Sequence, residues 1–255
     1  MDDPAPPPLA GWIVLSLRPQ GGHGGLRTAA SRLGAGFIAA APLRIVSLDD
    51  PPARTALAAA LRCRCIVVTS PNAVRHASRL ARLPRTREWI AVGAASAAAL
   101  RRLGIARVVM PPRADSEGLL AMPQLSGLRG AGAVGLLTGR GGRGLLQPAL
   151  EARGVTVQRA DVYARVPAKV APAAWRRLRA ALADGRRIVL PLTSAEGWAA
   201  FAEQLPADLH DALRDARVVV PGARLEALAR RSGFADIAVA NGPHPSQLLD
   251  AARRG

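Results

Sequence analysis

The amino-acid sequence contains one series of strand, turn and helix segments twice. The hydroxyl pair Thr69 and Ser70 recurs as Thr193 and Ser194, with an offset of about 120 to 130 residues. Two further segments correspond at the same offset, 16–34 with 137–154 and 93–104 with 222–233. The period is far too long for a solenoid, and alternating strands and helices call for parallel sheets. The repeat therefore predicts two like α/β domains with a cleft between them.

The clearest single unit of this repeat is the stretch 65–80. An apolar, β-branched run at 66–68 predicts a buried strand, and a helical pattern follows the turn Thr69-Ser70-Pro71-Asn72. Ser70 or Asn72 can cap that helix, and Pro71 suits its first turn. The helical spacing places His76 on the polar side, beside arginines. The turn follows its strand at the edge where open parallel sheets bind ligands.

Composition restricts the class of partner. The chain has 255 residues, enough for one large or two small cores, and a formal charge of +17. Nearly all cations are arginines, Lys169 being the only lysine, and they are spread along the chain. Aromatic residues make up 3%, too few for base-stacking platforms. We expect a solvated, Arg-rich surface that favours anionic ligands and no nucleic-acid partner.

Other sequence features indicate the compartment and the absence of metal. No apolar run approaches the ~18 residues of a membrane span, and the acidic, Pro-rich start lacks the apolar segment of a signal peptide. Cys63 and Cys65 stand one residue apart without further cysteines, which favours a reducing cytosol over a disulfide framework or a Cys-based metal site. The histidines are scattered. We expect a cytoplasmic protein with no membrane partner and no metal.

A glycine pattern offers a competing site. Gly139, Gly141 and Gly144 match G-x-G-x-x-G after a strand, and Asp161 lies 17 residues beyond. The corresponding turn in the first repeat does not match, which weakens a dinucleotide interpretation. An anion at the following helix N-terminus, beside Arg140 or Arg143, is favoured over a dinucleotide.

The hydroxyl residues have two interpretations each. Helix capping is the simpler role for Ser70 and Ser194, because no His or Asp is placed to form a triad and G-x-S-x-G is absent. Gly93 and Ser96 fit a turn and a cap in the same way. Tyr163, the only tyrosine, is either a half-buried packing residue or a phenol that donates a proton or hydrogen bond.

Together these segments resemble the uroporphyrinogen-III synthase family. The similarity extends from Trp12 to Ala252, and its order and spacing are more specific than any single motif. Ser96 stands where the family usually has threonine, and Pro191 interrupts a normally apolar strand. The segments that carry the resemblance are 69–74, 91–100, 154–165 and 192–194.

The resemblance implies two similar three-layer α/β/α domains with parallel sheets. The first strand–helix unit of each repeat would lie in the other repeat's domain, and a two-stranded linker would join the domains. Domain one would be 1–41 plus 168–255, domain two 47–162, and the linkers 42–46 and 163–167. A monomer without a cofactor is expected.

The family reaction cyclises hydroxymethylbilane, a linear tetrapyrrole, with inversion of its last pyrrole ring and loss of water. The resemblance implies that the enzyme positions this polycarboxylate in the inter-domain cleft. Tyr163 becomes the candidate catalytic residue, assisting water loss. The remaining candidates would bind substrate: Arg18, Thr69, Ser70, Asn72, Gly93, Ser96, Arg140, Thr193 and Ser194.

Two alternatives belong to other functional classes. One is a non-catalytic, anion-binding regulatory relative with the same two domains. The other is a nucleotide-dependent oxidoreductase that uses the glycine turn at 139–144.

Overall fold

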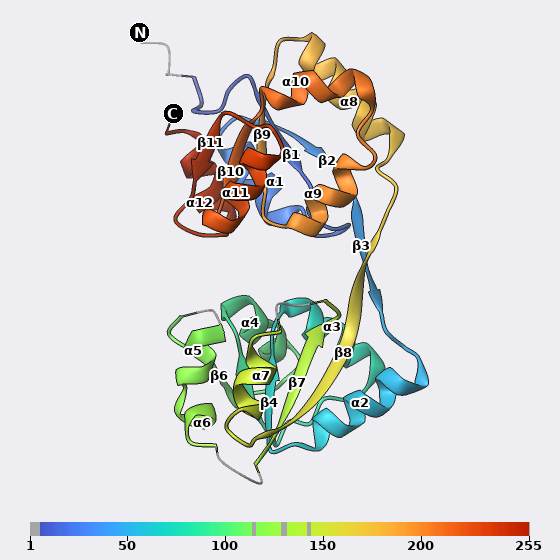
Figure 1. Cartoon of the computed structure of the whole chain (residues 1–255), viewed down its shortest axis with the longest axis vertical. Coiled ribbons are helices and arrows are strands. Elements are labelled where there is room, and N and C mark those ends of the chain that lie inside the picture. Colours follow the sequence, from blue (N-terminus) through green and yellow to red (C-terminus); the bar gives the residue numbers. More distant parts are fainter. Residues whose placement is uncertain (1–5, 114–115, 129–131, 142–143, 255) are drawn as a thin grey trace. The chain divides into compact units, whose positions relative to one another are not determined.

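The computed structural model describes residues 6–113, 116–128, 132–141 and 144–254 (Figure 1). The chain forms two compact units: unit 1 is Met1–Arg44 with Val166–Gly255, and unit 2 is Ile45–Arg165. Both division points fall inside the expected linkers 42–46 and 163–167.

Unit 1 contains a parallel sheet built from short apolar runs. In spatial order its strands are β11 (Ile237–Val239), β10 (Arg217–Val220), β9 (Arg187–Pro191), β1 (Trp12–Ser16) and β2 (Gly36–Ala39). Neighbouring strands pair in parallel, so their carboxyl ends share one edge. Pro191, which the sequence places within a normally apolar strand, is the last residue of β9, and a strand end is a position where a sheet tolerates proline.

Helices cover both faces of this sheet because successive strand residues point to opposite sides. Val14 packs in one core cluster with Leu26 of α1 (Gly24–Arg32) and Leu248 of α12 (Pro245–Ala252). Its neighbour Leu15 packs in the other cluster with Leu178 and further helical residues. That second face is covered by α8 (Pro172–Ala183), α9 (Ala195–Ala202), η1 (Ala207–Leu209), α10 (His210–Arg214) and α11 (Ala223–Arg231).

Unit 2 contains a second sheet of the same kind. Its strands, in spatial order, are β3 (Leu43–Ser47), β8 (Thr156–Pro167), β7 (Ala133–Gly139), β4 (Cys65–Val68), β5 (Glu88–Ala91) and β6 (Val108–Val109). The pairings from β8 through β6 are parallel. Since β4 is buried on both faces, its sequence is a continuous apolar run without alternation.

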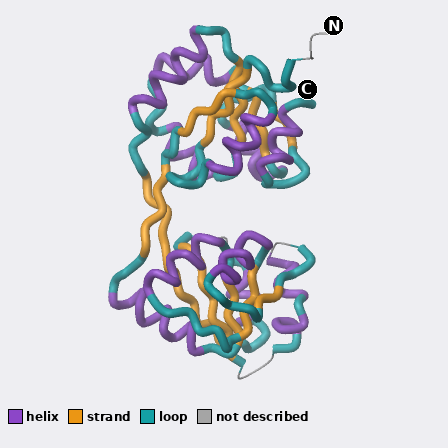
Figure 2. Tube along the Cα trace, turned by 180° about the vertical axis from the view of Figure 1, so that it is seen from behind, coloured by secondary structure: helices purple, strands orange, loops and turns teal. Residues whose placement is uncertain are grey.

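Two layers of helices enclose the unit 2 sheet (Figure 2). Ile66 packs with Leu57, Val74 and Leu100, which lie on α2 (Pro51–Arg62), α3 (Pro71–Leu80) and α4 (Ala94–Arg102). Val67 faces the other cluster, which includes residues of α5 (Ser116–Ala121), α6 (Pro123–Ser126) and α7 (Leu146–Glu151). Each unit is therefore a three-layer α/β/α sandwich, as the resemblance implied.

The strand order confirms the exchange of the first units of the two repeats. β1, α1 and β2 come from the first repeat but pack with β9, β10 and β11 of the second. Conversely, β7 comes from the second repeat and lies between β8 and β4 in unit 2. β3 and β8, which neighbour each other in the sheet, are the strands that cross the division points.

Two kinds of feature are absent from the described ranges. Among those residues, no helix has the length and apolar character needed to cross a bilayer. The same residues hold no group of three or more His, Cys, Asp or Glu side chains suited to a metal ion.

Candidate active site

The predicted residues of unit 2 gather at the carboxyl edge of its parallel sheet. Thr69 and Ser70 directly follow β4, and Arg140 directly follows β7. Gly93 is the second residue after β5. Tyr163 of β8 pairs with the last residue of β7 across an irregularity in the register. Segments far apart in sequence thus bring these side chains to one edge, where parallel α/β sheets bind ligands.

Tyr163 is buried, with 3% of its surface exposed, and its ring lies against Gly139. A Cβ added at Gly139 would come within 2.4 Å of the Tyr163 Cζ and 2.8 Å of its phenol oxygen. Only glycine leaves room for the ring in this position. The Arg140 N–H donates to the Tyr163 carbonyl at 2.8 Å, which fixes the backbone beside the ring.

The phenol oxygen of Tyr163 lies 3.2 Å from the Ser70 Oγ. Ser70 is also the N-cap of α3, where its Oγ accepts a hydrogen bond from the Ala73 N–H at 3.1 Å. The capping interpretation of Ser70 is confirmed, and the same hydroxyl has a second partner that the sequence did not indicate.

The position of His76 differs from the polar helix face that the sequence predicted. The residue is 5% exposed and lies on the buried face of α3 with Ala73 and Ala77. Its Nδ1 lies 2.6 Å from the Ser47 Oγ, and its ring centroid lies 5.6 Å from that of Tyr163 at an interplanar angle of 32°. The sequence held one signal of this burial: His76 follows Ala73 by three residues, and residues three apart lie on the same face of a helix.

Burial sets the protonation of His76. Desolvation, followed by the positive charges of Arg79 and Arg75, lowers the pKa of the His76 imidazole. The neutral ring is therefore the form favoured beside Tyr163 at neutral pH.

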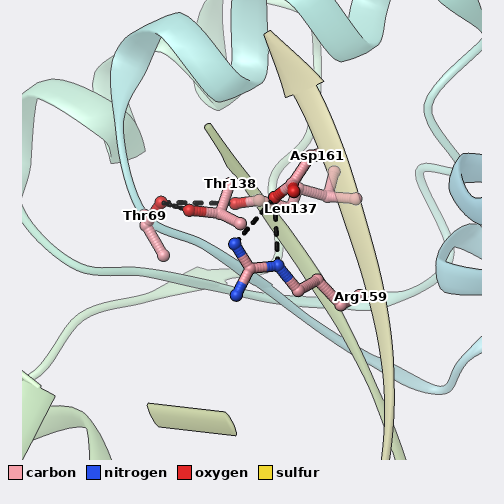
Figure 3. Close-up of polar contacts among 5 residues, drawn as sticks. All are labelled: Thr69, Leu137, Thr138, Arg159 and Asp161. Carbon is pink, nitrogen blue, oxygen red and sulfur yellow. Dashed lines mark hydrogen bonds and ion pairs between the residues drawn. The ribbon is translucent and has the colours of Figure 1, made fainter. Parts of the chain in front are cut away.

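The Thr69 hydroxyl forms its hydrogen bonds with other residues of unit 2. Its Oγ1 donates to the Thr138 Oγ1 at 3.0 Å, with the Leu137 carbonyl at 3.4 Å, and Figure 3 shows the two threonine side chains facing each other. The Arg159 Nε donates to the Asp161 Oδ1 at 3.0 Å on the adjacent strand (Figure 3). Thr69 therefore links the ends of β4 and β7.

The other unit 2 candidates differ in exposure. The Asn72 Oδ1 accepts from Arg75 at 2.9 Å on the surface of α3. Gly93 is the N-cap of α4, and Ser96, the third residue of that helix, is 2% exposed. The Arg140 side chain is exposed.

The unit 1 candidates occupy the corresponding edge of their own sheet. Ser194 caps α9, its Oγ accepting from the Gly197 N–H at 3.2 Å, so it matches Ser70 in geometry as in the repeat. Thr193 is half-buried beside it. Arg18 follows β1 and is half-buried, and burial lowers the pKa of its guanidinium.

A second buried histidine lies at the unit 1 edge. The Nδ1 of His23 is 2.9 Å from the Oγ of Ser16, and both residues are at least nine-tenths buried. Desolvation, then Arg27 and Arg18, lower the pKa of His23. No sequence pattern pointed to this pair.

The glycine pattern at 139–144 has local structural causes. Gly139 accommodates the Tyr163 ring, and Gly141 and Gly144 have φ values of 77° and 63°, which favour glycine. The next helix, α7, starts only at Leu146 and is six residues long. Arg143, one of the two arginines considered for an anion here, lies outside the described residues.

The cysteines are not candidates for nucleophiles. Cys63 and Cys65 are free and buried. Burial, followed by Glu88 and Cys63, raises the pKa of the Cys65 thiol to about 12, which keeps it protonated at neutral pH.

Comparisons with known proteins agree with this architecture. The family model described as uroporphyrinogen-III synthase HemD matches residues 25–250. The uroporphyrinogen-III synthase of Escherichia coli (strain K12) is 31% identical over 170 residues, which is 66% of this chain and 68% of that protein.

Solved structures support the fold. A uroporphyrinogen-III synthetase from Helicobacter pylori 26695 has a TM-score of 0.61 and 15% identity, covering 94% of this chain and 97% of its own. A mutant uroporphyrinogen III synthase from Thermus thermophilus has a TM-score of 0.56 and 22% identity, covering 95% and 98%. With the family model matching most of its length, the chain belongs to the uroporphyrinogen-III synthase family.

Proposed function

We propose that this protein is a uroporphyrinogen-III synthase, a cyclising lyase of tetrapyrrole biosynthesis. It converts hydroxymethylbilane to the cyclic product with inversion of the last pyrrole ring and loss of water. Family membership supports the reaction class. One observation supports Tyr163 as the residue that acts on the substrate: its phenol oxygen is held 3.2 Å from the Ser70 Oγ at the carboxyl edge of the unit 2 sheet.

The reaction needs an acid for the leaving hydroxyl and control over the last ring. Protonation of the hydroxyl releases water and leaves a cationic azafulvene. The substituted carbon of the last ring attacks to form a spirocyclic intermediate, which fragments and recloses with the ring inverted. The proton supplied at water loss is balanced by the proton released when the closed ring regains its aromaticity.

The hydrogen-bond pattern allows Tyr163 to act as the donor to substrate. The Ser70 Oγ accepts from the Ala73 N–H and still has its own proton, and we propose that it donates this proton to the phenol oxygen. The Tyr163 proton is then available to the substrate hydroxyl. General acids of this kind typically contribute about 10² to 10⁴ in rate.

Positive groups at the sheet edges are suited to the substrate's carboxylates. The N-termini of α3, α4 and α9 present backbone N–H groups, and helix N-termini favour anions. We propose that substrate carboxylates bind at these edges, on both units. The proposed binding residues are Arg18, Thr69, Ser70, Asn72, Gly93, Ser96, Arg140, Thr193 and Ser194.

We further propose that the protein acts as a monomer in the cytoplasm, on this small molecule alone. The free, buried cysteines are compatible with a reducing compartment.

The decisive experiment is the isomer produced from freshly made hydroxymethylbilane by the purified protein. The product is oxidised to porphyrin and its isomers are separated by chromatography. We expect the inverted isomer, since the unassisted reaction closes without inversion. If only the uninverted isomer forms, at the rate of the protein-free control, the enzymatic assignment is wrong and the anion-binding regulatory alternative gains support.

A further inference from the structure

We propose that His76, held by Ser47, is a positioning residue that fixes the Tyr163 ring for proton transfer. This inference rests on the catalytic role proposed above for Tyr163. It concerns two residues, His76 and Ser47, that no sequence motif places at the site.

The Tyr163 ring is restrained by three residues of unit 2, one on β7, one on α3 and one at the N-cap of α3. Gly139, the last residue of β7, lies so close to the ring that no Cβ fits between them. His76 of α3 places its imidazole 5.6 Å from the ring, centroid to centroid. Ser70 holds the phenol oxygen at 3.2 Å. Removal of one restraint gives the ring a direction in which to move.

His76 is the restraint that is itself fixed from outside α3. The Ser47 Oγ, at the end of β3, lies 2.6 Å from the His76 Nδ1. A hydrogen bond to one ring nitrogen sets the tautomer and the orientation of an imidazole. The side chain of Ser47 thus determines how the imidazole faces Tyr163.

β3 and β8 are also joined directly at this point. The Leu48 N–H donates to the Val162 carbonyl at 3.2 Å, one residue from Ser47 on one side and from Tyr163 on the other. Ser47 and Tyr163 are therefore on adjoining backbone segments, and His76 bridges their side chains. An isolated core histidine needs only one polar partner. His76 has both a polar partner and a ring contact on joined strands, which restricts its orientation more strongly.

Burial first, and then the positive groups around His76, lower the pKa of the imidazole and favour its neutral form. Arg75 and Arg79 lie on its own helix, and the Arg165 guanidinium of β8 lies 5.8 Å from the centroid of the Tyr163 ring. A cationic imidazole would add a like charge to this group. Neutral His76 is suited to packing and orientation, while the proton for water loss comes from Tyr163.

Two groups of variants separate the ring contact from the hydrogen bond. H76N keeps a polar group near the Nδ1 position but loses the ring beside Tyr163. H76F keeps a ring but loses the bond to Ser47, as does S47A. H210Q, at an exposed histidine of unit 1, is the matched control.

The first readout is kinetic. We expect H76N to lower kcat for hydroxymethylbilane about tenfold with little change in KM, because a misplaced group loses transition-state stabilisation without losing uniform binding. We expect S47A and H76F to lower kcat by about threefold to fivefold for the same reason. H210Q should leave both constants unchanged.

The second readout uses the fact that Tyr163 is the only tyrosine in the chain. Protein labelled with [13Cζ]-tyrosine gives an NMR signal from this residue alone. We expect the signal to shift in H76N, H76F and S47A and to stay unchanged in H210Q. A shift shows that the phenol environment depends on His76 and Ser47, which a distant structural role would not produce.

The outcomes distinguish this inference from the proposed function. If Tyr163→Phe lowers kcat but H76N retains wild-type kcat and an unshifted tyrosine signal, His76 is only a core residue and the inference is wrong. If the wild-type protein forms no inverted isomer, the proposed function fails first. The tyrosine signal of S47A, which keeps the imidazole but loses its hydrogen bond, still decides whether the orientation of His76 affects Tyr163.

Discussion

The hydroxyl oxygens of Ser70 and Tyr163 lie 3.2 Å apart although the residues are 93 positions apart in the sequence. Ser70 comes from the first repeat and Tyr163 from the second. The contact exists because β7 and β8 of the second repeat join the sheet of unit 2, with β7 next to β4 and β8 beyond it. The phenol that we propose as the general acid is thereby held by a serine whose local role is to cap a helix.

Removal of the Tyr163 hydroxyl should affect chemistry and leave the fold intact. We expect Y163F to lower kcat at least about 100-fold, because the proposed general acid is lost. The share of uninverted product should rise as spontaneous closure competes. Substrate loss in samples quenched at timed intervals measures kcat, and chromatography of the products measures the isomer ratio. Circular dichroism is the control for folding. Unchanged turnover and isomer ratio would show that Tyr163 only packs.

Ser70 variants can separate helix capping from the contact with Tyr163. S70A should cost about 1 kcal/mol of unfolding free energy and S70G only a few tenths, since glycine is a tolerated N-cap. Both should lower kcat by about fivefold to tenfold, because each loses a hydrogen bond worth about 1 kcal/mol. Chemical denaturation and steady-state kinetics provide the two measurements.

A cap elsewhere in unit 2 is the control for Ser70. Asp50 caps α2, with its Oδ1 accepting from the Ala53 N–H at 2.8 Å on the exposed surface. D50A should lower stability like S70A but leave kcat unchanged. If kcat instead follows stability across all three variants, Ser70 has no role beyond its cap.

Gly139 should tolerate no side chain without a change at Tyr163. In G139A the new Cβ would meet the ring at 2.4 Å, so the ring must move away from its position. We expect kcat to fall by about 10- to 100-fold, the range that follows from a misplaced catalytic group. The tyrosine NMR signal should shift as well. G24A is the matched control, since a Cβ at Gly24 meets nothing within 4 Å.

Arg18 and Arg140 should contribute to binding more than to chemistry. We expect R18Q and R140Q each to raise KM about tenfold with kcat nearly unchanged, because a carboxylate contact is present in ground and transition states alike. Higher ionic strength should reduce the difference from wild type for exposed Arg140. R32Q, at the exposed last residue of α1, is the control. A loss confined to kcat would contradict a binding role.

Stability should fall as the pH is lowered through the histidine range. The pKa values of His23 and His76 are lowered in the folded state, chiefly by burial, so the unfolded chain binds more protons below about pH 6.5. The contribution of the two histidines to the unfolding free energy is thus fully present above that pH. It decreases as the pH falls toward their pKa values in the folded state. Each histidine can contribute at most about 1.4 kcal/mol per pH unit.

Urea denaturation at several values between about pH 5.5 and 7.5 measures this slope above the range of carboxylate titration. H23Q and H76Q should each reduce the slope, and H210Q controls for the loss of an exposed histidine. Equal slopes in all four proteins would show that the buried histidines do not cause the dependence.

Local features of the site were predictable from sequence because neighbouring residues determine them. Ser70 caps α3 and Pro71 begins it, as the spacing indicated. The start of α12 shows the limit of this reasoning. Serine is a favoured N-cap residue, yet Ser246 lies inside the helix, because Pro245 takes the first helical position and His244 becomes the N-cap.

Contacts between distant segments were not predictable in the same way. The arginines around His76 indicated a polar helix face, yet its partners, Ser47 and Tyr163, lie on strands that the helix meets only in the folded unit. The exchange of β1 and β7 likewise depends on strand order, which the repeat alone leaves open. The family resemblance supplied the exchange; it did not supply His76.

The exchanged strands also determine the order in which the protein can fold during synthesis. Unit 2 is one continuous segment, Ile45–Arg165, so the ribosome delivers all of it before β9 begins at Arg187. β1 and α1 are made first but find their neighbours β9 and α12 last. While unit 2 folds, β1 can pair with β2, but its other edge, which β9 will occupy, stays open. An open apolar strand edge of this kind is prone to association with other chains until β9 is made.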